Sequence, residues 1–294
     1  ELVELVDAGF YRSLQELYQT NPKPTFFYHV PKTGGMSLYY GLNVSRLCLD
    51  RRELLQKEQK NIIKVDVQEK LSEIKPELIN DKCFIASHLN FGAHELIEGQ
   101  DFHLATMVRE PFARFISEFN YDCMRKQTKP KLKKIKPRVN DANYQNIICK
   151  QLWGNGEEVE NTEAFGKKVF EHLQQNFEIF TDVEHVDKLL EYYLSVYEQP
   201  NVLMPNMNVT AEKFRLEQED EEQIEQQFYE LNVADVTLYK LIKANPKLPR
   251  TDGIAKNQIA GVTTIIFESG DASRSVAKGN IGETAHLHAV LSVL

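Results

Sequence analysis

Residues 25–37 read TFFYHVPKTGGMS, and this stretch decides the fold that the chain is expected to adopt. The segment 25–30 is a short apolar run rich in β-formers, which predicts a buried strand. Pro31 and two glycines end the run abruptly, and residues 37–42 have helical character. The sequence therefore predicts a strand, a tight loop and a helix, in that order.

The loop of this unit, Lys32 to Ser37 (KTGGMS), has the parts of a phosphate-binding site. Backbone N–H groups at a helix N-terminus attract an anion, glycine lets the backbone come close to it, and lysine adds positive charge. The lysine precedes the glycines, so the loop does not match the G-x-x-x-x-G-K-[ST] pattern of nucleoside triphosphatases. We expect a phosphate cradle; the alternative is a tight turn whose lysine is only solvated.

Two more apolar runs predict buried strands. They are Cys83 to Ser87 (CFIAS) and His103 to Val108 (HLATMV). The segment 109–111 (REP) ends the second run, and four apolar residues then recur at the spacing of a helix: Phe112, Phe115, Ile116 and Phe119.

Residues 50–75 predict a partly exposed helix and a linker, and residues 178–181 predict a short strand. Three more helices are expected, at 163–177, 183–197 and 220–243. Repeated strand-then-helix units favour an α/β fold, with a P-loop-like parallel β-sheet flanked by helices in a single domain.

We expect that domain to occupy residues 25–294, after a helical extension at 1–24. Its C-terminal part, 246–294, has a less regular pattern, in which residues 261–267 (GVTTIIF) resemble a strand.

The charge of the chain excludes one class of function. A formal net charge of −8 over 294 residues argues against a general nucleic-acid binder. Residues 125–138 (RKQTKPKLKKIKPR) differ from this average, because they hold eight basic residues and no acidic one. Pro130 and Pro137 discourage a helix there. The segment is either a solvated loop or a positively charged lip that attracts an anionic acceptor or cofactor.

The four cysteines show no zinc-site spacing, and we expect no metal site. Cys123 and Cys149 flank the basic segment, and their spacing leaves open whether they form a disulfide. No run approaches the roughly 18 apolar residues of a membrane span, so none is expected in this chain. The acidic N-terminal residues do not resemble a secretory signal. A cytoplasmic location is favoured, and the Golgi lumen is the alternative if an upstream anchor has been removed.

Three motifs, in this order and spacing, resemble those of the carbohydrate sulfotransferases that use 3′-phosphoadenosine-5′-phosphosulfate (PAPS). This family includes heparan sulfate 2-O-sulfotransferase and its bacterial relatives. The string 29–35 (HVPKTGG), with Ser37, is similar to the loop that binds the 5′-phosphosulfate. The string 87–92 (SHLNFG) resembles the segment that carries the proposed catalytic histidine, and 108–117 (VREPFARFIS) resembles the 3′-phosphate motif. The resemblance extends over roughly residues 25 to 242.

The resemblance implies which residues bind the donor. Those around the 5′-phosphosulfate would be Pro31, Lys32, Thr33, Gly34, Gly35, Met36 and Ser37. Arg109 and Ser117 would bracket the 3′-phosphate through charge-assisted hydrogen bonds. Lys278 and Gly279 lie in a string, KGNIGE, that resembles a C-terminal cofactor loop of cytosolic sulfotransferases, although the tryptophan expected after it is Thr284.

The resemblance also implies a mechanism without a metal ion. Lys32 would neutralise the charge on the departing 3′,5′-ADP, and His88 would take the proton of the acceptor hydroxyl. Three other side chains are alternative bases: Glu110, Glu95 and His94. His29 lies in the first strand beside the loop, and His103 is expected to be structural.

We therefore expect a sulfotransferase that moves the sulfuryl group of PAPS to a hydroxyl, on an anionic glycan or another carbohydrate, by in-line displacement. Two alternatives remain. One is a kinase-like nucleotide-dependent transferase, which is disfavoured by the order of lysine and glycine and by the lack of an acidic Mg²⁺ motif. The other is a non-catalytic module of the same fold that binds a glycan or a nucleotide.

Overall fold

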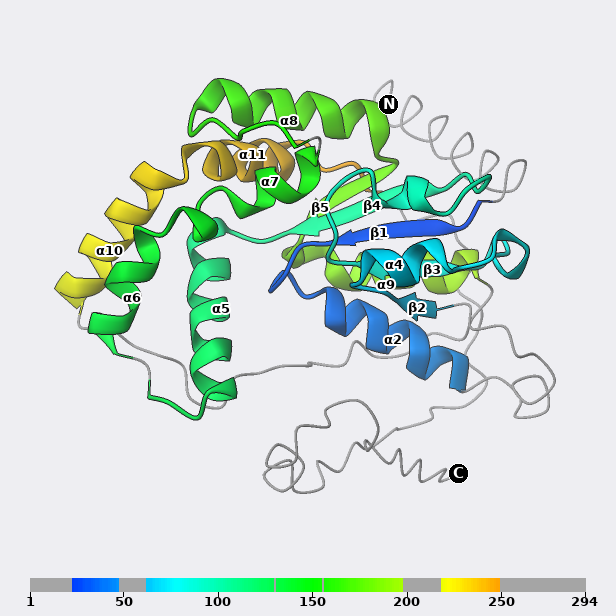
Figure 1. The fold of residues 1–294 in the computed structure, drawn as a ribbon, viewed down its shortest axis with the longest axis horizontal. Coiled ribbons are helices and arrows are strands. Elements are labelled where there is room, and N and C mark those ends of the chain that lie inside the picture. The colour runs from blue at the N-terminus through cyan, green and yellow to red at the C-terminus, as the bar shows by residue number, and fades with distance from the viewer. Residues whose placement is uncertain (1–22, 48–61, 130, 155, 198–217, 249–294) are drawn as a thin grey trace, which may run out of the picture. The chain divides into compact units, whose positions relative to one another are not determined.

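The computed structural model describes residues 23–47, 62–129, 131–154, 156–197 and 218–248 (Figure 1). These residues form a parallel sheet of five strands in the order β2-β3-β1-β4-β5. The strands are β1 (Thr25–His29), β2 (Ile62–Lys64), β3 (Phe84–Ser87), β4 (His103–Val108) and β5 (Ile179–Asp182). The expected α/β fold with a parallel sheet and flanking helices is confirmed.

Every residue of β1, β3 and β4 is buried, which explains why these strands are continuous apolar runs in the sequence. Neighbouring side chains of β1 enter different cores, as the alternation of a strand requires. Phe26 and Tyr28 belong to a cluster with residues of the helices α7 (Ile147–Trp153), α8 (Glu163–Asn176) and α11 (Val233–Ala244). Phe27 belongs to a cluster with α2 (Gly35–Leu47) and α9 (Val186–Val196). Figure 1 shows these two layers on opposite faces of the sheet.

Three more helices form a separate apolar cluster beside the sheet. They are α5 (Pro111–Arg125), α6 (Leu132–Val139) and α10 (Gln218–Leu231). Phe115 of α5, Ile135 of α6 and Phe228 of α10 are fully or almost fully buried in this cluster. The shorter helical segments are α4 (Gln68–Ser72), η1 (Pro76–Leu78), η2 (Ala93–Leu96), η3 (Ala142–Tyr144) and η4 (Val183–His185).

The basic segment is partly helical, contrary to the expectation drawn from its prolines. Residues 132–139 form α6 with Pro137 inside it. Ile135 and Val139 are buried, at 0% and 1% exposure, so the apolar contacts of one face outweigh the hydrogen bond that proline removes. Arg138 also donates to Asp122 of α5 over 2.8 Å, which fixes the end of the helix.

Two other expectations are corrected. The helix expected at 220–243 is two helices, α10 and α11, which are separated at Asn232. The Asn232 side chain is buried, donates to the carbonyl of Phe228 and accepts from the backbone of Asn146, so the break provides an anchor for α7. Within 50–75, residues 62–64 form the edge strand β2, which is too short to show a pattern in the sequence, and 50–61 lie outside the described residues.

Cys123 and Cys149 are buried and free, so they form no disulfide with each other. Within the ranges that the structure describes, no helix has the length and apolar character needed to cross a membrane. The expected extension at 1–24, apart from its last two residues, and the C-terminal residues 249–294 lie outside the described ranges.

Candidate active site

The candidate residues follow three neighbouring parallel strands. Because β1, β3 and β4 run in the same direction, their carboxyl ends meet at one edge of the sheet. The phosphate loop follows β1, His88 follows β3, and Arg109 follows β4. The fold therefore brings the three motifs to one edge.

The loop after β1 has the geometry of an anion cradle. The Thr33 hydroxyl is buried and donates to the carbonyl of Val30 over 2.7 Å, which closes the turn. Helix α2 starts at Gly35, and its first turn has no acidic residue. Among the described residues, no acceptor faces the backbone N–H groups of Gly34, Gly35 and Met36. Free N–H groups at a helix N-terminus are a ready site for a phosphate.

Close neighbours leave no room for a side chain at either glycine of the loop. Gly34 has φ +85°, and a Cβ on it would lie 2.9 Å from a methyl group of Val183. A Cβ on Gly35 would lie 2.3 Å from the ring of His29, a distance that real Cβ atoms do not reach. The loop is thus packed between η4 on one side and the His29 ring on the other.

Lys32 has a constrained backbone and a defined side-chain position. Its φ of +70° is uncommon for a residue with a Cβ and is typical of strained functional sites. Its ammonium group lies over the ring of Tyr121 in α5, 4.1 Å from the ring centre. Burial lowers the pKa of Lys32, Glu118 opposes this change, and Arg109 adds to it.

Arg109 and Ser117 are the two residues expected to bind the 3′-phosphate. Arg109 lies just before α5, and Ser117 lies in the middle of this helix. Arg109 donates weakly to the carbonyl of Lys32 over 3.5 Å, so the two motifs touch. Burial lowers the pKa of Arg109, but a guanidinium remains charged at any physiological pH. Ser117 is partly exposed and its hydroxyl has no hydrogen bond to a described residue. It shares a helix face with Tyr121, four residues later, on which Lys32 lies.

Helix α5 is oriented by its own acidic and basic residues. The Glu110 carboxylate caps its first turn, because it accepts from the N–H groups of Phe112 and Ala113 over 3.0 and 2.6 Å. Arg114 is buried, at 1% exposure, and pairs with Glu118 over 2.9 Å. Glu110 is therefore engaged in a structural role, which makes it a poor candidate for a base.

His88 is held on two sides. Its backbone N–H donates to Oδ1 of Asp66 over 3.1 Å, and its ring Nδ1 lies 3.4 Å from the same oxygen. Its Nε2 lies 2.9 Å from Nδ1 of His29. Burial lowers the pKa of His88, Asp66 raises it, and Lys64 lowers it. A histidine with a lowered pKa is neutral at pH 7 and can accept a proton.

The segment that carries His88 is fixed by Gln151 of α7. The buried Gln151 amide donates to the carbonyls of His29 and Leu89 over 3.1 and 3.3 Å. The backbone carbonyl of Gln151 accepts from the N–H of Phe91 over 2.7 Å. Nothing in the sequence near Gln151 indicates this role, because it depends on contacts between distant segments.

The remaining candidates have other partners or lie elsewhere. His94 Nδ1 lies 2.5 Å from the hydroxyl of Tyr28, which also accepts from the N–H groups of Gly92 and His94. Burial raises the pKa of Tyr28 far above its usual range. Glu95 is exposed and His103 is buried within β4. Lys278 and Gly279 lie outside the described residues.

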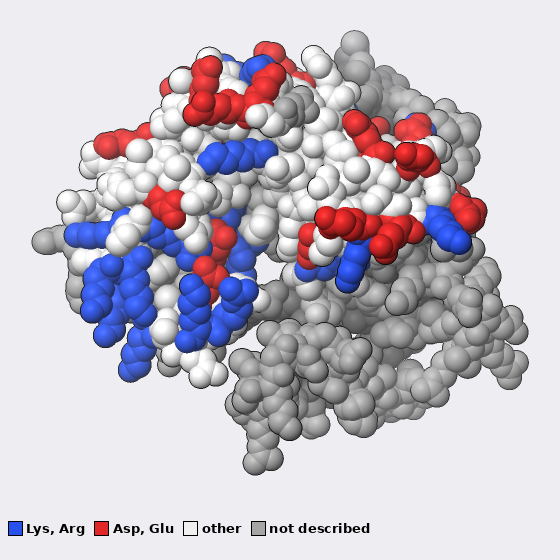
Figure 2. Space-filling view, in the orientation of Figure 1, with Lys and Arg blue, Asp and Glu red and all other residues white. Residues whose placement is uncertain are grey.

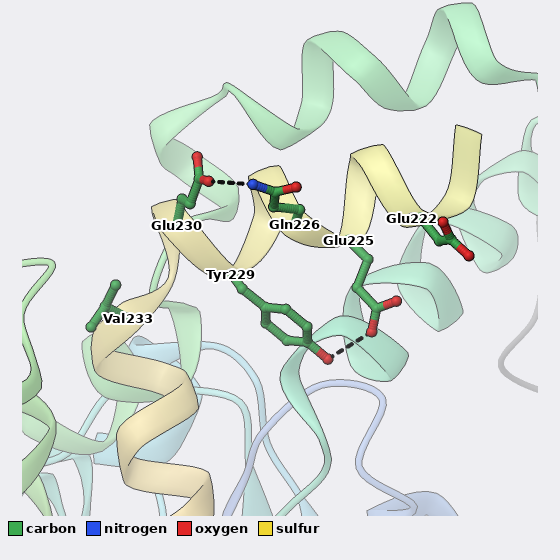
Figure 3. A pocket seen from close by; sticks show the side chains of 6 residues that line it. All are labelled: Glu222, Glu225, Gln226, Tyr229, Glu230 and Val233. Carbon is green, nitrogen blue, oxygen red and sulfur yellow. Dashed lines mark hydrogen bonds between the residues drawn. The ribbon is translucent and has the colours of Figure 1, made fainter. Parts of the chain in front are cut away.

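A pocket of about 580 Å³ lies along α10, and its lining includes none of the candidate site residues (Figure 3). Its lining residues are Glu222, Glu225, Gln226, Tyr229, Glu230 and Val233. The Tyr229 hydroxyl lies 2.9 Å from Glu225 and 3.1 Å from Glu110, and burial, with Glu110 next, raises its pKa. Three carboxylates make this pocket unfavourable for an anionic donor.

Basic side chains gather on the surface formed by α6 and the end of α5 (Figure 2). We call this the α6 surface; its exposed members are Arg125, Lys126, Lys129, Lys131, Lys133, Lys134 and Lys136. Ion pairs of Arg138 with Asp122 and Glu118, at 2.8 and 3.8 Å, connect it to α5. In the described part of the chain, no three His, Cys, Asp or Glu side chains are placed to hold a metal ion.

A family model described as "Sulfotransferase family" matches residues 17–190, a range that includes the phosphate loop, His88 and Arg109. No curated protein matches the chain.

Proposed function

The chain belongs to the sulfotransferase family, and on this premise we propose that it transfers the sulfuryl group of PAPS to a hydroxyl of a carbohydrate. The observation that carries the proposal is the convergence of the phosphate loop, His88 and Arg109 at one edge of the sheet. A loop with free N–H groups, a lysine and a nearby arginine suits a donor with two separate phosphate sites.

The donor would lie with its 5′-phosphosulfate on the loop and its 3′-phosphate near Arg109. Gly34, Gly35 and Met36 would supply N–H groups to the 5′-phosphate. Arg109, and Ser117 through its hydroxyl, would hold the 3′-phosphate. The contact between Arg109 and the Lys32 carbonyl supports a single ligand that spans both motifs.

In the transfer step, the acceptor oxygen forms a bond to sulfur while the bond between sulfur and the bridging oxygen of the phosphosulfate breaks. His88 receives the acceptor proton on a ring nitrogen, and 3′,5′-ADP leaves with the electron pair of the broken bond. Lys32 neutralises the charge that grows on the leaving oxygen. The lowered pKa of His88 supports its role as the base.

The α6 surface supports an anionic carbohydrate as the acceptor. It presents seven exposed basic side chains in one segment of a chain whose net charge is −8. Such a surface raises the local concentration of an anion and speeds its encounter with the protein. Sulfated or uronic-acid glycans have this charge together with free hydroxyl groups.

Thermal unfolding with two ligands tests the donor. A ligand that binds only the folded state stabilises it by RT ln(1 + [L]/Kd), or about 2.7 kcal/mol at one hundred times Kd. We expect 3′,5′-ADP to raise the Tm and Mg-ATP to leave it unchanged. Stabilisation by Mg-ATP alone would support the kinase-like alternative and contradict the proposal.

Turnover with labelled PAPS and a panel of acidic and neutral glycans then tests transfer. Binding of 3′,5′-ADP without transfer to any acceptor would favour the non-catalytic alternative. Transfer to an acidic glycan, weakened by salt, is the expected result.

A further inference from the structure

Asp66, His88 and His29 form a continuous row of polar contacts beside the phosphate loop. Asp66 Oδ1 lies 3.4 Å from Nδ1 of His88, and Nε2 of His88 lies 2.9 Å from Nδ1 of His29. The two imidazole rings are 4.4 Å apart between their centres. His29 is 3% exposed and is the last residue of β1.

The contacts favour one placement of the two protons. The Asp66 carboxylate pairs with Lys64 over 3.2 Å and can only accept hydrogen bonds. Its proximity, 3.4 Å from Nδ1 of His88, favours a proton on that nitrogen. A neutral imidazole has a single N–H, so Nε2 of His88 is an acceptor, and the nitrogen opposite it, Nδ1 of His29, must donate.

The charged groups around His29 keep it neutral. Burial lowers its pKa well below the usual value, and His88, Lys64 and Lys32 lower it further. Lys64 is the last residue of β2, Asp66 follows that strand, and Lys32 belongs to the phosphate loop. A neutral His29 has one proton to donate, and the geometry directs it to His88.

Contacts with Gly35 and Gln151 also hold His29 in place. Its ring fills the space that a side chain on Gly35 would need, so it packs closely against the start of α2. Its carbonyl accepts from Gln151, which also holds the Leu89 carbonyl next to His88. The ring is therefore a rigid element between the phosphate loop and the base.

We propose that His29 is a positioning residue, which donates its Nδ1–H to Nε2 of His88 and holds this base neutral and oriented until Nε2 of His88 exchanges that hydrogen bond for one from an acceptor hydroxyl. The inference rests on the proposed function of His88 and adds a second histidine to the site. It accounts for the direction of Nε2 of His88, which faces His29.

A measurable consequence concerns the pKa of His88. A hydrogen bond donated to Nε2 stabilises the neutral imidazole and thus lowers the pKa. Removing the donor should raise the pKa of His88 by about half to one unit, the equivalent of one ordinary hydrogen bond. The acidic limb of the profile of kcat/KM against pH should move to higher pH by the same amount, because that profile reports the free enzyme.

The test begins with the unchanged protein. Nitrogen-15 NMR of labelled histidine, with the His88 signal assigned from a His88→Gln variant, shows which ring nitrogen is protonated. We expect the Nδ1–H tautomer of His88 in the free protein. The Nε2–H tautomer would overturn the inference, and this measurement needs neither turnover nor a change at a buried position.

Two variants of His29 form a matched pair. In His29→Asn the amide places an N–H donor at about the position of Nδ1, whereas His29→Phe keeps a ring and loses the donor. We expect the pKa of His88 and the acidic limb to rise in His29→Phe and to stay near the unchanged values in His29→Asn. Equal values in all three proteins would overturn the inference.

A further variant covers the case in which His29→Phe does not fold. Asp66→Asn presents an amide that can donate to Nδ1 of His88, so we expect the Nε2–H tautomer to become populated. An unchanged tautomer would contradict the row of contacts. If the tautomers respond as expected but transfer survives in His88→Ala, the assignment of the base is wrong, whereas the contact between the two histidines stands.

Discussion

The ammonium group of Lys32 lies 4.1 Å from the ring centre of Tyr121, so the lysine of the phosphate loop is held against α5 rather than extended into solvent. Ser117 lies one turn before Tyr121 on the same helix face. A lysine from the first motif thus reaches the helix of the third motif. The proposed donor site therefore lies between these two elements.

Lys32→Ala should lose transfer. The ammonium group stabilises charge that develops only in the transition state, and removal of one such group typically lowers kcat by about 10²- to 10³-fold. Turnover with labelled PAPS measures the loss. Lys168→Ala is a matched control, because Lys168 is a half-exposed lysine in α8 whose partner is Glu157. Equal activity of both variants would contradict the role of Lys32.

His88→Ala should bind 3′,5′-ADP normally and lose transfer by about 10²- to 10⁴-fold. In the unchanged protein, the base is active when neutral, and burial lowers its pKa below the usual value near 6.5. The rate should therefore be constant near pH 7 and fall only as the pH drops below about 6.5. A profile of kcat/KM that is still rising above pH 7 would be inconsistent with His88 as the base.

Arg109→Ala should reduce the ability to distinguish 3′,5′-ADP from 5′-AMP. The two ligands differ by the 3′-phosphate, which Arg109 would hold by a charge-assisted hydrogen bond worth about 1.5 to 3 kcal/mol. Calorimetric titration of both ligands measures the difference. The affinity for 5′-AMP serves as the internal control and should change little. A uniform loss of affinity for both ligands would indicate a structural role for Arg109.

Gly35→Ala should disrupt the loop far more than Gly99→Ala does. A methyl group at Gly35 would meet the His29 ring, whereas nothing lies within 4 Å of the corresponding position at Gly99. Gly99 has φ +75°, so its variant measures backbone strain alone, at about 1 to 2 kcal/mol. Chemical unfolding and 3′,5′-ADP binding of both variants test this. Preserved binding in Gly35→Ala would show that the loop can relax around the methyl group.

Reversal of charge on the α6 surface should weaken binding of the acceptor and leave binding of the donor unchanged. Replacing Lys133, Lys134 and Lys136 with glutamate should raise the KM of an acidic glycan several-fold and reduce its salt dependence. The KM of PAPS should stay within about twofold, because these lysines are exposed on α6 and do not belong to the phosphate loop. If the KM of PAPS rises instead, the surface attracts the donor.

Much of the sheet could be predicted from the sequence. The strand expected at His103 to Val108 has those bounds in the structure, because both its faces are covered and every residue is buried. The motifs after β1, β3 and β4 could be recognised because each buried apolar strand ends abruptly at a polar segment. The parallel order of the strands then placed the motifs at one edge.

The partners of the motifs could not be predicted. Asp66 follows a strand of three residues at the edge of the sheet, which is too short to produce a period. The contact between His29 and His88 joins residues 59 apart in the chain. Helix α6 contains Pro137, which disfavours a helix locally. The helix forms because its apolar residues are buried against α5 and α10. Each of these features depends on tertiary contacts rather than on local preference.

The ion pairs between Arg138 and the acidic residues of α5 fix the distance between α6 and the start of α5. Helix α5 has 15 residues and is about 22 Å long. It starts beside Arg109, and Glu118 and Asp122, which hold α6, lie in its second half. Under the proposed function, a polyanion bound to the exposed lysines of α6 would lie at a fixed distance from the phosphate loop, and the position of the modified sugar along the polymer would depend on the length of this helix.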